Sequence, residues 1–358
     1  MAVRDWLLGL FDRSPRTRDH GLRTRGPATH VVILDGTMSS LDPGEETNAG
    51  LTFKLLDEAG RRANLTVYYE AGVQWRDWRG TSDVMVGRGI NRQIRRAYGV
   101  LASRYRPGDR IVLIGYSRGA YAVRSLAGVI GLVGLVESGH ATERNVRQAY
   151  RHYQTGATGE AAAAFSARYC HHHTPIEAVA IWDTVKALGF RWPILWRWTG
   201  TRHDFHHHGL GSHVQHGFHA LALDENRAAF TPVLWDTVPA DADRIEQVWF
   251  RGTHGDVGGQ VSAFPEARPL ANVPLCWMLD RLEACGLPLP DGWRRRFETD
   301  PTAPSAGTWR GWGKIFLVRR RRVIGLDASE RLHSTALGHP LWPRTAQEVV
   351  PELTSRTA

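Results

Sequence analysis

A serine set between two glycines, Gly115-x-Ser117-x-Gly119, is the part of the sequence best suited to covalent chemistry. A short run of β-branched apolar residues precedes it and an apolar pattern with helical spacing follows it, which predicts a buried strand, a tight turn and a helix. The glycines leave room for a sharp turn that exposes the serine hydroxyl at the helix N-terminus, where free N–H groups favour developing negative charge. The pattern predicts a nucleophilic serine. The alternative is a turn whose serine only caps the helix, although a cap does not require the second glycine.

A serine hydroxyl needs a base to take its proton, and the base needs a carboxylate to orient it. Asp183 ends one apolar strand-like run, and His254 follows another in a glycine-rich loop. The order serine, aspartate, histidine along the chain is the order that α/β hydrolases use. We therefore expect Ser117, Asp183 and His254 to form a catalytic triad. Asp256 is the rival orienting acid, and an Asx turn at Asp183 or a locally satisfied turn histidine at His254 are the structural alternatives.

Backbone N–H groups near the serine are expected to stabilise the oxyanion. One donor is the residue after the nucleophile, Arg118, and the other belongs to the turn Gly36–Thr37, directly after an apolar run. The Arg118 side chain is left open between binding an anionic substrate and forming a salt bridge.

The expected strands alternate with helical patterns along the chain. The strands are 30–34, 64–69, 110–114, 177–182 and 245–250, and the helices include 51–62 and 90–105. Because each strand is a nearly continuous apolar run, it should lie in a parallel sheet covered on both faces. In such sheets, sites form beyond the carboxyl ends of the strands. The predicted fold class is α/β, α/β-hydrolase-like, with a mostly parallel sheet, helices on both faces and inserted cap segments.

The chain is expected to divide into three parts. Residues 1–28 form an N-terminal arm and residues 286–358 a C-terminal extension packed on the core. Residues 29–285 form the α/β-hydrolase domain, with cap insertions at about 138–176 and 189–243.

Composition limits the partners and the compartment. No apolar run approaches the roughly 20 residues of a membrane span, and the N-terminus is too acidic for a secretory signal, so we expect cytoplasmic synthesis, with export by a signal-independent system left open. The three cysteines lack a CxxC spacing, which argues against a disulfide framework. No cofactor is expected, and the oligomeric state is left open.

A net charge of +9 would attract phosphate on nucleic acid or on lipid headgroups. The sequence contains no helix-turn-helix, zinc-finger or RNP-like pattern, so nucleic-acid binding is not expected. The run Arg319–Arg322 fits a solvated face better than a phosphate site. The spacing of His213, His216 and His219 would suit a metal site on one helix face, so a metal-dependent hydrolase is a minor alternative, although no metal is assigned.

Trp192, Trp196 and Trp198 alternate with arginines and are the candidate substrate- or lipid-facing residues. This composition is typical of a lipid–water interface and predicts peripheral membrane contact. A cap element that packs its tryptophans inward fits equally well.

Five motifs in order resemble one known family. They are Asp35–Thr37, Gly115–Tyr121, Trp182–Val185, His219–Glu225 and Val248–Gly259. Together they resemble the α/β-hydrolase family that includes type VI secretion phospholipase effectors, over roughly residues 29–285. The sequence departs from that family's pattern at Met38-Ser39, Gln74-Trp75 and Gln260.

The resemblance implies a serine hydrolase that cleaves carboxylic esters through an acyl-enzyme, with lipid and glycerophospholipid acyl esters among the candidate substrates. The alternative is a non-catalytic α/β-hydrolase scaffold, or a protein that binds phosphate or lipid headgroups. The chain keeps the serine, the histidine and both elbow glycines, which favours the enzyme.

Overall fold

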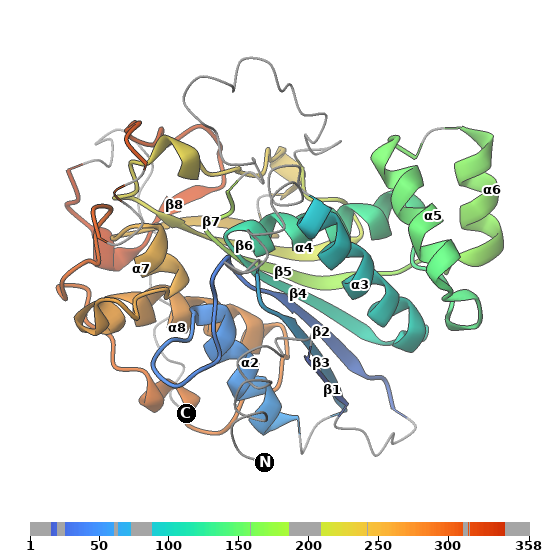
Figure 1. The fold of residues 1–358 in the computed structure, drawn as a ribbon, viewed down its shortest axis with the longest axis horizontal. Helices are drawn as coiled ribbons and strands as arrows, with labels where there is room; N and C mark the ends of the chain where they lie inside the picture. Colours follow the sequence, from blue (N-terminus) through green and yellow to red (C-terminus); the bar gives the residue numbers. More distant parts are fainter. Residues whose placement is uncertain are drawn as a thin grey trace, which may run out of the picture.

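One eight-stranded sheet organises the part of the chain that the computed structural model describes, residues 16–19, 26–60, 64–72, 88–157, 159–185, 209–241, 243–310, 314 and 316–340 (Figure 1). The strands are β1 (Arg16–Asp19), β2 (Thr29–Leu34), β3 (Leu65–Glu70), β4 (Arg110–Tyr116), β5 (Ile176–Trp182), β6 (Val214–Ala222), β7 (Ile245–Phe250) and β8 (Glu330–Leu332). Their order across the sheet is β1-β3-β2-β4-β5-β6-β7-β8. Only the pairing of β1 with β3 is antiparallel among these strands.

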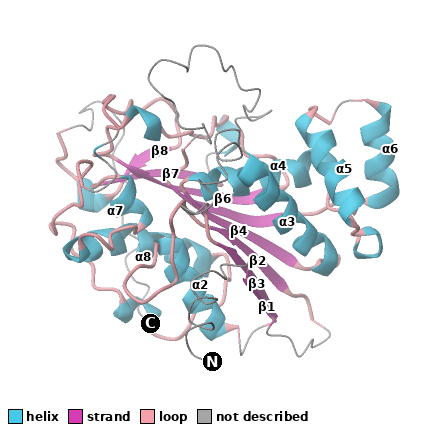
Figure 2. Cartoon of the chain, viewed as in Figure 1, coloured by secondary structure: helices cyan, strands magenta, loops and turns pink. Residues whose placement is uncertain are grey.

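Helices cover both faces of the sheet (Figure 2). The α-helices are α2 (Asn48–Ala59), α3 (Arg88–Arg104), α4 (Arg118–Val133), α5 (Glu143–Gln154), α6 (Glu160–Tyr169), α7 (His254–Gly258) and α8 (Arg268–Ala284). Successive residues of a strand point to opposite faces. Leu113 of β4 accordingly joins the core under α3 and α4, whereas Val112 and Ile114 join the core under α2 and α8. The predicted mostly parallel sheet, with helices on both faces, is confirmed.

The carboxyl ends of the central strands lie within two residues of one another along one edge, which determines where a site can form. Tyr116 of β4 lies opposite Trp182 of β5, and Ala222 of β6 lies opposite Phe250 of β7. The residues that follow these strands therefore emerge along one edge of the sheet, as is usual for ligand sites in α/β folds.

Three strands were not expected from the sequence. Val214–Ala222 was assigned to a cap insertion and is instead β6, paired with β5 and β7 in the sheet. This strand contains Gln215, two histidines and a glycine, so it lacks the continuous apolar run of its neighbours. Its pairing on both edges overrides its weak strand propensity. β1 and β8 are only four and three residues long and contain charged residues, so they give no strand signal either.

The helices α5 and α6 form a pair at one side of the molecule (Figure 1). Ser166 of α6 donates a hydrogen bond to the carbonyl of Val133, the last residue of α4. This insertion, predicted as a cap, therefore packs at the end of α4 away from Ser117. None of the helices in the described ranges combines the length and hydropathy that crossing a bilayer requires.

Candidate active site

Two glycines allow the backbone to pack closely around the sharp turn at Ser117. A Cβ atom on Gly119 would lie 2.0 Å from the Leu34 carbonyl oxygen, and one on Gly115 would lie 2.7 Å from the backbone of Ala120. Only glycine allows the first turn of α4 to approach β2 and β4 this closely. Ser117 itself has φ +58° and ψ −120°, a strained conformation for a residue with a side chain. Its hydroxyl makes no capping bond to α4, so the capping alternative is wrong.

Ser117, His254 and Asp183 lie in one hydrogen-bonded line. Nε2 of His254 is 2.8 Å from Oγ of Ser117, and Nδ1 is 2.5 Å from Oδ2 of Asp183. All three are buried, and Ser117 retains 6% of its surface. With the proton on Nδ1 donated to the carboxylate, Nε2 is free to accept the serine proton. The structure thus brings together the three residues that the sequence assigned to the triad.

Arg322 is a fourth partner of this group, and the sequence analysis missed it. Its guanidinium donates to Asp183 Oδ1 at 2.5 Å and to Oδ2 at 2.8 Å, and also to the carbonyls of Ala222 and Phe230. Only 3% of the Arg322 side chain is exposed, so the expectation of a solvated face is wrong for this residue. The four consecutive arginines look equivalent in the sequence, and only the fold distinguishes this one from the others.

The charges around Asp183 keep it ionised. Burial alone would raise the pKa of the carboxyl, but the charge and hydrogen bonds of Arg322 and the bond from His254 hold that pKa well below its usual range. Burial lowers the pKa of His254, and the bond to Asp183 opposes this only in part. The imidazole is therefore neutral at neutral pH, which is the form that a general base requires.

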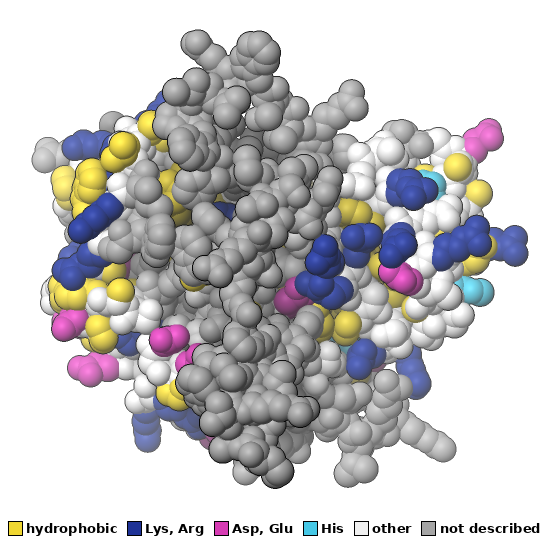
Figure 3. Space-filling view, viewed as in Figure 1, with side chains coloured by type: hydrophobic (Ala, Val, Ile, Leu, Met, Phe, Trp, Pro, Cys, Tyr) yellow, Lys and Arg dark blue, Asp and Glu magenta, His cyan; other side chains and the backbone are white. Residues whose placement is uncertain are grey.

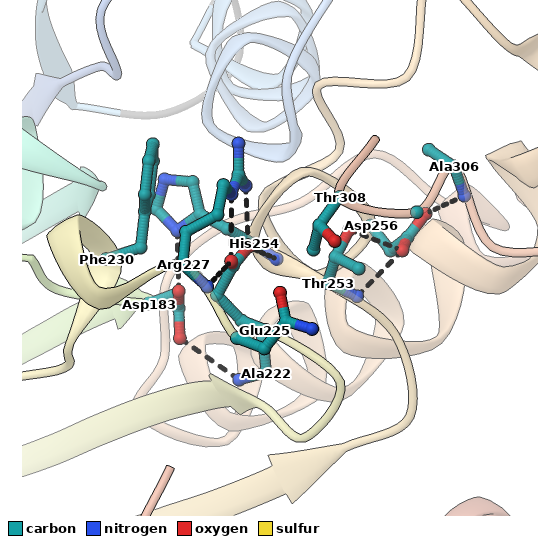
Figure 4. A network of polar contacts seen from close by, with 12 residues as sticks. Asp183, Ala222, Glu225, Arg227, Phe230, Thr253, His254, Asp256, Ala306 and Thr308 are labelled. Atoms are coloured by element: carbon teal, nitrogen blue, oxygen red, sulfur yellow. Dashed lines mark hydrogen bonds and ion pairs between the residues drawn. The ribbon is translucent and has the colours of Figure 1, made fainter. Parts of the chain in front are cut away.

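Aromatic rings enclose the imidazole of His254. The rings of Tyr116 and Phe230 lie 4.9 and 4.8 Å from it, centroid to centroid. Arg227 stacks over Phe230 at 3.9 Å and forms an ion pair with Glu225, whose carboxylate accepts a bond from the His254 backbone N–H (Figure 4). The Glu225–Arg227 pair, also missed from the sequence, therefore binds the His254 backbone directly and supports its imidazole through Phe230.

Asp256 does not orient the imidazole. Its carboxylate accepts hydrogen bonds from the backbone and hydroxyl of Thr253, from the Ser305 hydroxyl and from the Ala306 N–H (Figure 4). It is the N3 residue of α7 and closes a capping box with Thr253. Assigning it as the rival acid is therefore wrong. As the N3 residue of α7, its carboxylate binds the backbone N–H and hydroxyl of Thr253 instead of the imidazole.

The turn after β2 lies against the nucleophile elbow. A Cβ on Gly36 would lie 2.5 Å from the Tyr116 ring, and the Gly36 N–H donates to Asp35 Oδ1 at 2.6 Å. That N–H is therefore committed to a carboxylate, so Gly36 is not an oxyanion donor in this structure. Thr37 is positioned by its carbonyl, which accepts a hydrogen bond from Gln260 Nε2 at 3.0 Å. The Thr37 hydroxyl is buried without a hydrogen-bond partner in the described part of the chain.

Asp35 anchors that turn from below. Besides the Gly36 N–H, its carboxylate accepts from the hydroxyls of Thr47 and Tyr69, each at 2.7 Å. Burial raises its pKa to about 6, against the lowering effect of these donors.

A buried carboxyl with a raised pKa favours the folded state at low pH. This contribution is complete below the unfolded pKa of 3.8 and is lost as the pH rises through about 6. For Asp35→Asn we expect the unfolding free energy to change less between pH 4 and 6.5 than in the wild type. The difference should reach up to about 3 kcal/mol across that range. Denaturant unfolding of both proteins across that range measures it, and parallel curves for the two proteins would contradict the assignment.

The histidines proposed as an alternative metal site do not converge. His213 precedes β6 and bonds to the Ala127 carbonyl, whereas His219 lies within β6 between the Thr184 N–H and the Gln247 side chain. His216 and His219 are three residues apart on a strand, so they point to opposite faces. The expectation of one helix face is therefore wrong. Trp192, Trp196, Trp198, Gln74 and Trp75 lie outside the described residues.

One other group of potential ligands exists among the described residues. Glu177, His216 and Cys285 each offer a ligand atom, and these atoms lie within 4.8 Å of one another. Glu177 and His216 stand near the starts of β5 and β6, so the group lies at the opposite edge of the sheet from Ser117. The Arg110 guanidinium already pairs with Glu177 at 3.2 Å, which disfavours a cation there.

Comparison with known proteins gives matches of several kinds. An uncharacterized protein of Saccharomyces cerevisiae is 26% identical over 252 residues, which cover 61% of this chain and 35% of the yeast protein. A crystal structure of an uncharacterized protein from Pseudomonas aeruginosa covers 78% of this chain and 50% of that one, at 15% identity and a TM-score of 0.41. The chain therefore spans about a third and a half of these two proteins.

Two solved structures carry functional names. The Tle1 effector bound to the VgrG spike of the type 6 secretion system covers 65% of this chain and 51% of that one, at 15% identity and a TM-score of 0.31. The apo form of Thermogutta terrifontis esterase 2 covers 77% of this chain and 91% of that one, at 15% identity and a TM-score of 0.38.

The family comparison covers most of the domain that carries the site. The model described as "T6SS, Phospholipase effector Tle1-like, catalytic domain" matches residues 29–281, which include Ser117, Asp183 and His254 but not Arg322. The chain therefore belongs to the Tle1-like family of type VI secretion phospholipase effectors, over the extent of its catalytic domain.

Proposed function

We propose that the protein is a serine hydrolase that cleaves carboxylic esters through Ser117, His254 and Asp183. The observation that carries this proposal is the hydrogen-bonded line from Ser117 Oγ to His254 Nε2, 2.8 Å, and from His254 Nδ1 to Asp183, 2.5 Å. The strained elbow at Ser117 and the family membership support it independently.

In the proposed reaction, Ser117 Oγ attacks the ester carbonyl carbon while His254 Nε2 takes the hydroxyl proton. The imidazolium is stabilised by Asp183 and then gives the proton to the leaving alcohol, which produces an acyl-enzyme. Water, deprotonated by the same nitrogen, attacks the acyl carbon, and the imidazolium returns the proton to Ser117 Oγ as the acyl–oxygen bond breaks and the acid is released. The backbone N–H groups of Arg118 and Thr37 are the proposed oxyanion donors, because the N–H of Gly36 is already bonded to Asp35.

The Arg118 side chain favours an anionic substrate over a neutral one. It directly follows the nucleophile, and burial lowers the pKa of its guanidinium. No hydrogen bond or ion pair holds that guanidinium within the described part of the chain, so the salt-bridge alternative finds no partner there. A half-buried guanidinium with no counter-charge among the described residues favours a ligand that supplies one. A glycerophospholipid, with its phosphate close to the acyl ester, fits this requirement.

The test is a substrate panel of p-nitrophenyl esters, neutral glycerides and defined glycerophospholipids, assayed beside Ser117→Ala. The proposal expects ester turnover that the Ser117→Ala variant lacks. Folded wild-type protein that hydrolyses none of these esters would instead favour the non-catalytic scaffold.

Arg118→Gln separates substrate choice from chemistry, because it removes the guanidinium and keeps the backbone N–H. We expect kcat/KM for an anionic phospholipid to fall at least about tenfold, as for the loss of one charge-assisted hydrogen bond. The loss on p-nitrophenyl butyrate should be much smaller. Arg118→Lys is the matched control and should retain part of the preference. Equal losses on both substrates would contradict a role in headgroup recognition.

A further inference from the structure

Large apolar side chains exposed to solvent gather in one segment near the C-terminal end of the described residues. Within residues 301–326 the exposed fractions are Trp309 57%, Leu317 74%, Val318 68%, Val323 51% and Leu326 70%, and Leu337 follows further along the chain at 60%. Val238, 59% exposed, is the one other exposed large apolar residue within the described ranges. Isolated exposed apolar residues are ordinary, but a concentration of them marks an interaction surface.

The charges in this segment all have one sign. Residues 301–326 contain six basic residues and no aspartate or glutamate. The basic residues are Arg310, Lys314, Arg319, Arg320, Arg321 and Arg322. The next acids along the chain are already engaged, Asp327 with the Thr237 hydroxyl and Glu330 with the indole of Trp249. Figure 3 shows hydrophobic and basic side chains next to one another on the left of the molecule, the side where Figure 1 places the red C-terminal part of the chain, with acidic side chains lower on the same edge.

Backbone hydrogen bonds fix the segment to the core. The Ala228 N–H donates to the Val318 carbonyl at 3.0 Å, and the Arg320 N–H donates to the Asn226 carbonyl at 2.7 Å. Arg319 stacks over the Trp309 ring at 4.0 Å, which joins two positions ten residues apart in the segment. The backbone that carries the exposed apolar side chains is therefore fixed by hydrogen bonds to residues 226–228.

The same segment reaches the active site. Phe316 lies against Phe230 at 5.1 Å, and Phe230 lies against His254 at 4.8 Å. Arg322 is the ion-pair partner of Asp183. A partner that binds the exposed residues on either side of Arg322 would therefore lie close to the triad.

We propose that this C-terminal surface, defined as Trp309, Arg310, Leu317, Val318, Arg320 and Arg321, docks on an anionic phospholipid membrane. Aliphatic side chains enter the acyl boundary while guanidiniums meet headgroup phosphates, which is the pairing that such an interface requires. Nucleic acid would use the arginines and leave Leu317 and Val318 without a role. The inference rests on the proposed function, since docking brings the ester bonds of the membrane to Ser117.

Vesicle binding tests the surface apart from catalysis when the whole chain carries Ser117→Ala, so that no lipid is consumed. We expect cosedimentation with phosphatidylcholine vesicles that contain phosphatidylglycerol, and much weaker binding to phosphatidylcholine alone. Arg320→Gln with Arg321→Gln should weaken binding by about 25-fold, about fivefold for each arginine, with a smaller effect at high salt. Leu317→Ser with Val318→Ser should weaken it at least about tenfold. The control pair Arg144→Gln and Arg147→Gln, on the distant helix α5, should bind as the parent does.

Each failure has a distinct signature. The surface assignment is overturned if anionic vesicles are not bound, in which case an acidic protein partner fits the surface better, or if both surface pairs bind as the parent does. The same pairs in the chain with Ser117 intact should still hydrolyse p-nitrophenyl butyrate, which also reports that they fold. Loss of that activity in a folded variant would mean that the segment serves the triad rather than a membrane. Absence of ester turnover in the unmodified chain, with vesicle binding retained, would remove the proposed function and leave the docking surface.

Discussion

Ser117→Ala should lower kcat for ester hydrolysis by about 10⁵- to 10⁶-fold, the scale seen when the nucleophile of a serine triad is removed. The reason is chemical, because alanine has no oxygen to form the acyl-enzyme. The change should alter the unfolding free energy by only about 1 kcal/mol, since among the described residues the hydroxyl makes one hydrogen bond, to His254. Steady-state kinetics and denaturant unfolding measure the two effects.

His254→Ala provides the companion result. Members of a triad act as one unit, so its loss should be of similar size, and the double variant should be little worse than either single one. A Ser117→Ala variant that kept a tenth of the wild-type rate would place the chemistry on another residue.

Arg322→Met should be the most damaging substitution outside the three triad residues. It leaves the Asp183 carboxylate buried with no cation, and breaking a buried ion pair from one side costs about 3–5 kcal/mol of unfolding free energy. We expect kcat to fall as well, because both carboxylate oxygens lose a donor that aligns them. Arg322→Lys should recover only part of either loss, since one ammonium cannot bond both oxygens as the guanidinium does.

A double-mutant cycle with Asp183→Asn isolates the pair. Each single change leaves one buried charge unpaired, whereas the double variant removes both, so the double should be about 2–3 kcal/mol less destabilised than the sum of the single changes. Strict additivity would contradict direct coupling between Arg322 and Asp183.

The pH profile distinguishes a role in positioning and charge from a merely structural one. Removing the Arg322 cation favours protonation of the Asp183–His254 pair as a whole and so raises its apparent pKa. The base must be unprotonated, so the acid limb of kcat/KM should move to higher pH in Arg322→Met. Arg281 is the matched control, because it is a largely buried arginine paired with Glu246 away from the triad. Arg281→Met should lose stability without moving that limb.

Local patterns in the sequence predicted the strands and turns that carry the triad. β2, β4, β5 and β7 are apolar runs whose signal needs no knowledge of the rest of the fold. The elbow could be expected for the same reason, since Gly115 and Gly119 flank Ser117 within five residues. Because parallel strands place their carboxyl ends along one edge, the convergence of Asp183 and His254 on the serine followed from topology.

The features that sequence analysis missed depend on contacts between distant segments. Arg322 reaches Asp183 across 139 residues, and nothing in the arginine run marks it. β6 is stabilised by pairing on both of its edges rather than by its own composition. The oxyanion prediction for Gly36 failed because its N–H is bonded to the Asp35 carboxylate. Thr47 and Tyr69 orient that carboxylate, and a linear pattern does not show their contacts.

The most direct test of the central claim is to treat the folded wild-type chain with a fluorophosphonate probe and to locate the adduct by peptide mass spectrometry. We predict one adduct, on Ser117, that is absent from Ser117→Ala and forms far more slowly in His254→Ala. An adduct on a different residue, or a folded wild-type chain that takes up no probe, would contradict the proposed serine mechanism.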